Sequence, residues 1–231
     1  MKSVIVSGGS GGLGAGVTKL AKERGYAVVA GYLRNRERAE ALGVAVVGGD
    51  ILDSTVRASL IEAASKAGEL YGLVVLVGDP ARVPIEKATV DDLVDSFRVN
   101  FAGPVLLARD FAAALGDRDG SIVFLSTMQG VGVFPGSTVY AAPKAALAHT
   151  AKILAKQWKI RVNVVAPGVN DAGMAAQSVR SGKYDAFLEK QIIPRFGRPE
   201  DVAKAILFLL EPDNYVTGQV LTVDGGLSLK M

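Results

Sequence analysis

The chain has no cysteine, a single histidine (His149) and no long apolar run. The lack of cysteine excludes disulfides, thiolate metal sites and cysteine nucleophiles. One histidine cannot build a histidine-rich metal centre, so we expect no metal ion. No apolar stretch approaches the roughly 20 residues of a membrane helix, and the N-terminus has neither the apolar core nor the cleavage site of a signal peptide. We therefore expect a cytoplasmic protein without a membrane partner.

Charged and aromatic side chains are present in moderate or small amounts. Aromatic residues make up 6%, charged residues 21% and hydrophobic residues 49% of the chain, and the formal net charge is +3. This composition is typical of a folded globular protein. Because Lys and Arg are spread along the chain instead of clustered in a stripe, we expect no nucleic-acid partner. The length of 231 residues predicts one domain over residues 1–231.

Apolar runs of strand length alternate with amphipathic segments of helix length. The predicted strands are Lys2–Ser7, Ala27–Gly31, Val44–Val47, Leu73–Val77, Ser121–Ser126, Ile160–Ala166 and Gln219–Val223. The predicted helices are Gly14–Arg24, Arg36–Leu42, Thr55–Ala67, Val90–Leu115, Val139–Trp158 and Glu200–Leu210. This alternation predicts an α/β fold, a Rossmann-type doubly wound parallel sheet of seven strands with helices on both faces. The irregular stretch 168–199 breaks the alternation and is a candidate lid over a substrate.

A glycine cluster, Ser7-Gly8-Gly9-Ser10-Gly11-Gly12-Leu13-Gly14, joins the first predicted strand to the first predicted helix. Glycines let the backbone turn tightly and approach a pyrophosphate, which the free N–H groups at the helix start can bind. The same letters would also suit a flexible turn. The position between a strand and a helix favours a nucleotide site.

Tyr140 and Lys144 are four residues apart on a predicted helix, so they share one face. A nearby ammonium favours phenolate and is expected to lower the pKa of the Tyr140 phenol toward neutrality, as a general acid working near pH 7 requires. Taken alone, this spacing is commonplace and would usually be structural. The order of features along the chain is what gives it weight.

From Ser7 to Leu227 the sequence resembles the short-chain dehydrogenase/reductase family. The family's Thr-Gly-x-x-x-Gly-x-Gly motif corresponds to Ser7, Gly8, Gly12 and Gly14, and its Tyr-x-x-x-Lys pair to Tyr140 and Lys144. Segments resembling the family's C-terminal signatures are Arg195–Val202, Thr217–Gln219 and Val223–Gly226. The resemblance implies that NADP(H) delivers hydride to a ketone carbon while Tyr140 protonates the oxygen, and that Lys144 also bonds the nicotinamide ribose.

The resemblance also implies roles for other residues. The implied catalytic residues are Asn100, Thr127, Tyr140 and Lys144, with Asn100 holding a water in a proton relay to the lysine. Asp50 stands where the family contacts the adenine ring, and Pro167-Gly168 where it shapes the nicotinamide pocket. The full set of implied cofactor-binding residues is Gly8, Ser10, Gly12, Leu13, Gly14, Arg34, Asp50, Ile51, Gly78, Tyr140, Lys144, Pro167, Gly168 and Val169.

Three positions depart from the family pattern. Thr127 stands where serine is usual; its hydroxyl can still donate to a carbonyl oxygen, and neighbouring Ser126 is held in reserve. The turn Leu76-Val77-Gly78-Asp79 replaces Asn-Asn-Ala-Gly, which removes polar ties and leaves the backbone to shape the turn. Ala172 replaces a threonine that bonds the nicotinamide carboxamide. These changes could weaken cofactor binding, alter the substrate or abolish activity.

The second predicted strand ends at Gly31-Tyr32-Leu33-Arg34-Asn35-Arg36, without the carboxylate typical of NAD-preferring members. A guanidinium suits a 2′-phosphate. We expect Arg34 to contact that phosphate and Arg36 to be a solvated residue at the helix start. The sequence thus favours NADP(H) over NAD(H).

Among family members, the chain looks most like the β-ketoacyl-acyl-carrier-protein reductases of fatty acid biosynthesis, which implies a 3-oxoacyl thioester on acyl carrier protein as substrate. Alternatives are another ketone, a sugar, a steroid or a polyketide. A non-catalytic NADP-binding scaffold or redox sensor is the alternative from another class. Family members commonly pair the helices that correspond to Val90–Leu115 and Val139–Trp158, which implies a homotetramer or homodimer.

Overall fold

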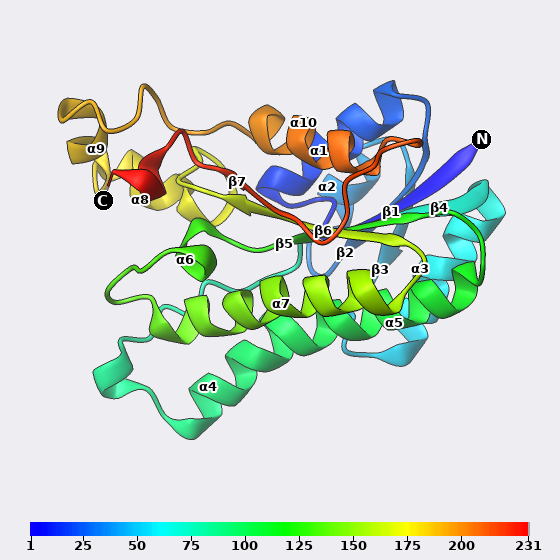
Figure 1. Cartoon of the computed structure of the whole chain (residues 1–231), viewed down its shortest axis with the longest axis horizontal. Coiled ribbons are helices and arrows are strands. Elements are labelled where there is room, and N and C mark those ends of the chain that lie inside the picture. The colour runs from blue at the N-terminus through cyan, green and yellow to red at the C-terminus, as the bar shows by residue number, and fades with distance from the viewer. Residues whose placement is uncertain (231) are drawn as a thin grey trace.

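The computed structural model describes residues 1–230. Seven parallel strands form one sheet in the order β3-β2-β1-β4-β5-β6-β7 (Figure 1). Their bounds are β1 Lys2–Ser7, β2 Ala27–Tyr32, β3 Ala45–Gly48, β4 Glu69–Val75, β5 Ser121–Leu125, β6 Arg161–Pro167 and β7 Val220–Val223. The predicted doubly wound sheet of seven strands is therefore confirmed.

Helices cover both faces of the sheet (Figure 1). One face packs against α1 (Gly12–Glu23) and α10 (Pro199–Leu210), and the other against α3 (Ser54–Ala67), α5 (Gly103–Leu115) and α7 (Thr138–Gln157). The short α2 (Arg36–Glu40) joins β2 to β3. Each face has its own buried apolar cluster, because the strands carry apolar side chains on both sides. None of the helices in residues 1–230 is long and apolar enough to cross a membrane.

Strand β4 begins at Glu69, earlier than the predicted start at Leu73. Gly72 interrupts the apolar run, so the hydrophobic pattern does not predict that the strand continues over its first half. In the structure Gly72 lies where a Cβ would come within 2.9 Å of Val4 Cγ2, so the neighbouring strand accepts only glycine there without moving. Leu70 and Tyr71 on this earlier part are buried.

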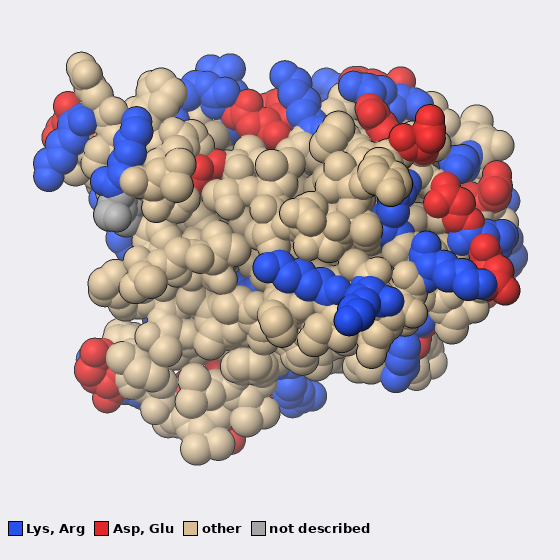
Figure 2. Space-filling model, viewed as in Figure 1, with Lys and Arg blue, Asp and Glu red and all other residues tan. Residues whose placement is uncertain are grey.

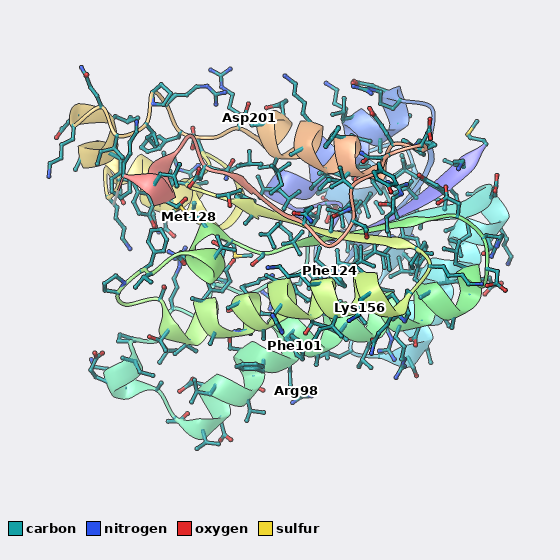
Figure 3. All side chains as sticks on the ribbon, in the orientation of Figure 1. Arg98, Phe101, Phe124, Met128, Lys156 and Asp201 are labelled. Carbon is teal, nitrogen blue, oxygen red and sulfur yellow. The ribbon has the colours of Figure 1, made fainter. Side chains whose placement is uncertain are left out.

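The predicted single helix Val90–Leu115 is wrong in its middle. The structure has α4 (Val90–Phe97), a π-helical turn at Arg98–Ala102, and then α5. Pro104 explains the break, because it has no N–H to donate to the carbonyl of Asn100 four residues earlier. Figure 3 shows the Phe101 side chain of this turn directed toward α7, where it packs against the core. The turn thus places Asn100 beside α7.

The stretch 168–199 holds three short helices, Gly173–Ala175, α8 (Ala176–Arg180) and α9 (Asp185–Glu189). It packs on a third apolar cluster, made of Met128, Val169, Ile193 and Leu227. At its end Arg195 pairs with Asp201 at 2.6 Å and fastens the stretch to the first turn of α10. Met128 belongs to α6 (Met128–Val131), beneath this stretch in Figure 3, and the remaining short turns are Ile85–Lys87 and Leu227–Leu229.

Lys and Arg lie among Asp and Glu along the upper and right-hand edges of the face shown in Figure 2, and further basic side chains form a row from its centre toward the right-hand edge.

Candidate active site

A cleft of about 1000 Å³ lies at the carboxyl ends of the strands. It is centred on the neighbouring strands β1 and β4, after which the chain continues to opposite sides of the sheet, to β2 and to β5. This crossover point is where open α/β sheets bind ligands. The cleft runs from the turn after β3 to the 168–199 stretch. Of the predicted site residues it is lined by Gly8, Ser10, Gly12, Leu13, Gly14, Asp50, Ile51, Gly78, Thr127, Tyr140, Pro167, Gly168 and Val169.

The glycine turn forms one wall of the cleft. Gly8 has φ of +80°, a left-handed conformation that glycine adopts without strain, and a Cβ at Gly14 would collide with the Gly8 carbonyl oxygen. Helix α1 starts directly after this turn, so its free N–H groups face the cleft. Among residues 1–230, the buried Ser7 hydroxyl in this wall has no hydrogen-bond partner. A tight glycine cradle, a helix start and an unpaired hydroxyl together fit a dinucleotide.

Tyr140 and Lys144 lie one turn apart on α7, as the spacing predicts. Tyr140 lines the cleft, whereas Lys144 is only 2% exposed and lies behind the wall. Its Nζ donates to the carbonyl oxygens of Leu125 at 3.0 Å and Val77 at 3.2 Å. These two bonds tie α7 to the ends of β4 and β5, and they leave the third N–H of Lys144 available to a ligand.

The expected depression of the Tyr140 pKa is wrong for this structure. Burial, and then the negative charge of Asp79, raise the pKa of the Tyr140 phenol to about 12. Burial also lowers the pKa of Lys144 to about 8, since the low-polarity interior disfavours its charged form. The hydrogen bonds of the Lys144 ammonium within residues 1–230 go to main-chain carbonyls. The phenol therefore stays protonated at neutral pH.

Asn100 is fully buried and grips the turn after β4 with both atoms of its side-chain amide. Its Oδ1 accepts from the Asp79 N–H at 3.0 Å, and its Nδ2 donates to the Asp79 carbonyl at 3.0 Å. A Cβ at Gly78 would come within 2.9 Å of Asn100 Oδ1 and 3.1 Å of Lys144 Nζ. The divergent Leu76–Asp79 turn is thus held through its backbone, and Gly78 lets both side chains approach it.

Thr127 and Ser126 both line the cleft, but their hydroxyls have different hydrogen-bond partners. Thr127 lines the cleft, and its Oγ1 accepts from the Gln129 N–H at 3.3 Å, which caps α6. The Ser126 hydroxyl donates to the Lys144 carbonyl at 2.9 Å and is buried. Since the hydroxyl of Ser126 is already committed to α7, Thr127 is the better placed of the two to face a substrate.

The arginines after β2 lie outside the cleft lining. Arg34 is exposed and contributes no lining atoms, although the adjacent Tyr32 and Leu33 do. Arg36 pairs with Glu40 on the surface of α2 at 2.7 Å, as expected for a solvated residue at a helix start. The segment 33–36, directly after β2, contains no Asp or Glu.

The cleft is bridged on its open side. Arg82, in the loop after β4, donates from Nη2 to the Met174 carbonyl at 2.8 Å. Close to Met174, the backbone of Gly173 touches Gly12 so closely that a Cβ on Gly12 could not fit. Ala172 lines the cleft with no hydroxyl to offer.

Sequence reasoning missed several buried polar residues around the site, among them Ser96 and Arg57. Ser96 contacts both Asn100 and α7, and its signal was a serine four residues before Asn100 on a predicted helix. Arg57 is 4% exposed and donates to the carbonyls of Ile51 and Leu52. No local pattern marks an arginine on an amphipathic helix as buried.

Comparison with known proteins agrees with this geometry. The family model described as Enoyl-(Acyl carrier protein) reductase matches residues 8–228. The 3-oxoacyl-[acyl-carrier-protein] reductase of Bos taurus is 36% identical, over 100% of this chain and 99% of that protein. The acetoacetyl-CoA reductase of Synechocystis sp. is 34% identical, over 97% and 95% of the two chains. The solved structure of an actinorhodin polyketide ketoreductase with NADPH superposes with a TM-score of 0.86 at 25% identity, covering 98% of this chain and 97% of that one.

The match to the family model extends over nearly the whole chain, and the motifs that carry it lie at the cleft. The chain therefore belongs to the short-chain dehydrogenase/reductase family of oxidoreductases, and within it resembles the 3-oxoacyl-acyl-carrier-protein reductases.

Proposed function

We propose that this enzyme uses NADPH to reduce the ketone of a 3-oxoacyl thioester, carried by acyl carrier protein, to a secondary alcohol. The observation that carries the proposal is the partly buried Tyr140 phenol in the cleft wall, one helical turn from the buried Lys144 ammonium. A proton donor beside a buried cation, in a cleft that fits a dinucleotide, suits carbonyl reduction.

The nicotinamide, when bound, supplies the hydride. Tyr140 donates its phenolic proton to the developing alkoxide, and its raised pKa keeps that proton on the phenol at neutral pH. Lys144, held in place by two carbonyls, stabilises the phenolate left behind through its positive charge. The Thr127 hydroxyl donates to the same carbonyl oxygen and orients the ketone. Asn100 keeps the turn under Lys144 in position.

Charge at the ribose end supports NADPH over NADH. The segment after β2 offers the exposed guanidinium of Arg34 and no carboxylate, so it can bind a 2′-phosphate and does not repel it. The relative whose structure is described with NADPH has the same fold. Gly8, Ser10, Gly12, Leu13 and Gly14 would hold the pyrophosphate.

The substrate assignment has two supports. Two relatives of about 35% identity are described as reductases of 3-oxoacyl-acyl-carrier-protein and acetoacetyl-CoA, which are both thioesters. In addition, two cations line the cleft from its open side, Arg82 after β4 and Lys183 in the 168–199 stretch. Positive charge at the mouth suits an anionic carrier. We further propose that the stretch 168–199 closes over the acyl chain and that the enzyme is a homotetramer or homodimer.

The test is the oxidation of NADPH by the wild-type protein and the Tyr140→Phe variant with an acetoacetyl thioester, repeated with NADH. We expect turnover with NADPH, a loss of about 10³-fold or more in the variant, and weaker activity with NADH. NADPH binding without turnover on a broad ketone panel would reject the reductase and favour the non-catalytic sensor. Turnover of other ketones alone would reject only the thioester.

A further inference from the structure

Helix α7 contains a proline in its second turn. In an α-helix the carbonyl of Val139 would accept the N–H of residue 143, but residue 143 is proline and has no N–H. Both Val139 and Pro143 are buried, so water cannot supply the missing donor. The Ser96 hydroxyl supplies it, donating to the Val139 carbonyl at 2.7 Å.

Ser96 is 4% exposed and lies near the end of α4. A serine hydroxyl has one proton, and the Val139 carbonyl takes it, so the Ser96 oxygen can only accept further bonds. It accepts from Asn100 Nδ2 at 3.2 Å. The direction of the first bond therefore makes Nδ2 the end of the Asn100 amide that can bond to Ser96, which is the orientation that the Asp79 N–H and carbonyl also require.

The bond to Ser96 therefore reinforces the grip of Asn100 on the turn after β4. With Nδ2 held between Ser96 and the Asp79 carbonyl, Oδ1 is left to accept the Asp79 N–H. Asn100 Oδ1 and Lys144 Nζ both lie within about 3 Å of the place that a Cβ on Gly78 would take, so the amide and the ammonium share the space beside this glycine.

We infer that Ser96 is a positioning residue for the reaction, because it replaces the helix hydrogen bond that Pro143 removes just before Tyr140 and orients the Asn100 amide that holds the turn under Lys144. The inference rests on the proposed function, in which Tyr140 and Lys144 reduce a ketone. It gives the Ser96 hydroxyl two roles: to satisfy the Val139 carbonyl of α7, and to bond the Asn100 amide that holds the turn after β4.

Pro143 makes the two roles separable. In the Ser96→Ala variant both bonds are lost. In the double variant Ser96→Ala/Pro143→Ala, the new N–H of residue 143 can bond the Val139 carbonyl, while Asn100 still lacks its acceptor. Melting temperature, NADPH affinity, kcat and KM are measured for wild type, Ser96→Ala, Pro143→Ala and the double variant. Ser121→Ala is the matched control, since the buried Ser121 hydroxyl also donates to a helix carbonyl, that of Leu209, far from the site along β5.

We expect Ser96→Ala to lower the melting temperature and to lower kcat about tenfold or more, with KM for NADPH within about twofold. The double variant should regain melting temperature but not kcat, relative to Pro143→Ala alone. Ser121→Ala should lose melting temperature and keep kcat.

Two results would overturn the inference: an unchanged kcat in Ser96→Ala, or a kcat that Pro143→Ala restores together with the melting temperature. If the wild type turns over no ketone, the proposed function fails and the inference with it. If the wild type is active and Ser96→Ala equals it, only the inference fails.

Discussion

The side chain of Lys144 is almost completely buried, and main-chain carbonyl oxygens accept hydrogen bonds from its ammonium group. Its ammonium donates to the Leu125 and Val77 carbonyls, and burial lowers the pKa of Lys144 to about 8. In the unfolded chain a lysine keeps its proton up to a pH of about 10.4. Between about pH 8 and pH 10 the unfolded state therefore binds more protons than the folded state, and the stability of the fold rises with pH.

We expect the free energy of unfolding of the wild type to rise between pH 7 and pH 10 relative to the Lys144→Met variant, by on the order of 2 kcal/mol. Methionine does not titrate, so the difference between the two proteins isolates this one group. Urea unfolding at both pH values measures it. Lys22→Met serves as the control for the loss of a lysine that donates to a carbonyl, because Lys22 donates to the Gly43 carbonyl on the surface. Parallel pH dependence in wild type and Lys144→Met would contradict the assignment.

At this scale the sequence predicted which residues share a helix but not where their atoms point. The four-residue spacing put Tyr140 and Lys144 on one face of α7, and that placement holds. The hydrogen bonds of Lys144 go to carbonyls of two other strands, which no spacing along α7 can reveal. The Tyr140 pKa depends on burial and on Asp79 from another loop, so its direction could not be derived from the pair alone.

Helices α3 and α5 are joined by an ion pair that also supports the turn after β3, at one end of the cleft. Arg57 on α3 donates to Asp110 on α5 at 2.6 Å and to the carbonyls of Ile51 and Leu52 at 2.8 and 3.0 Å. Asp110 keeps a second partner, Arg109, at 2.7 Å. The turn that carries Ile51 into the cleft is thus anchored to two helices behind it.

The two ends of this ion pair should fail differently. Asp110→Asn leaves the buried Arg57 guanidinium without its carboxylate and should cost about 3 kcal/mol of stability. Arg57→Met leaves Asp110 with Arg109, so we expect a smaller loss of stability but about tenfold weaker NADPH binding, since the turn loses its donor. Chemical unfolding and NADPH titration measure the two effects. Lys159→Ala, which breaks the exposed Lys159–Asp117 pair, should change neither; equal effects of both variants on binding would contradict the split.

Element types were readable where a strand or helix is apolar in a regular pattern, and less so where backbone chemistry decides. The seven strands appear near their predicted places because their sequences are apolar runs, which the five inner strands bury on both faces. The π-turn before α5 has no hydrophobic signature and follows from Pro104 and its missing N–H. The early start of β4 could not be predicted because Gly72 breaks the apolar pattern. The packing requires this glycine, since a side chain there would collide with Val4 on the neighbouring strand.

Over the whole molecule, the two core clusters hold the sheet between its helix layers, while the 168–199 stretch rests on a smaller third cluster of its own. This stretch meets the glycine turn at Gly173 and the loop after β4 through Arg82. Its helices are short and irregular in sequence, so only its existence as a separate segment could be predicted. A ligand in the cleft would lie between the carboxyl ends of the strands on one side and this stretch on the other.

A ligand bound only by the folded state adds to the stability of the whole molecule. At about 100 times its Kd, NADPH should add about 2.7 kcal/mol, which for a chain of this size raises the melting temperature by about 5–10 °C. NADH at the same concentration should raise it less if, as we propose, the exposed Arg34 pairs with the 2′-phosphate that only NADPH carries. Thermal unfolding with each nucleotide tests this, and Arg34→Ala should melt like the wild type without ligand and respond equally to both. If NADH and NADPH shift the wild type alike, the 2′-phosphate has no partner near β2, and cofactor preference must be sought elsewhere in the cleft.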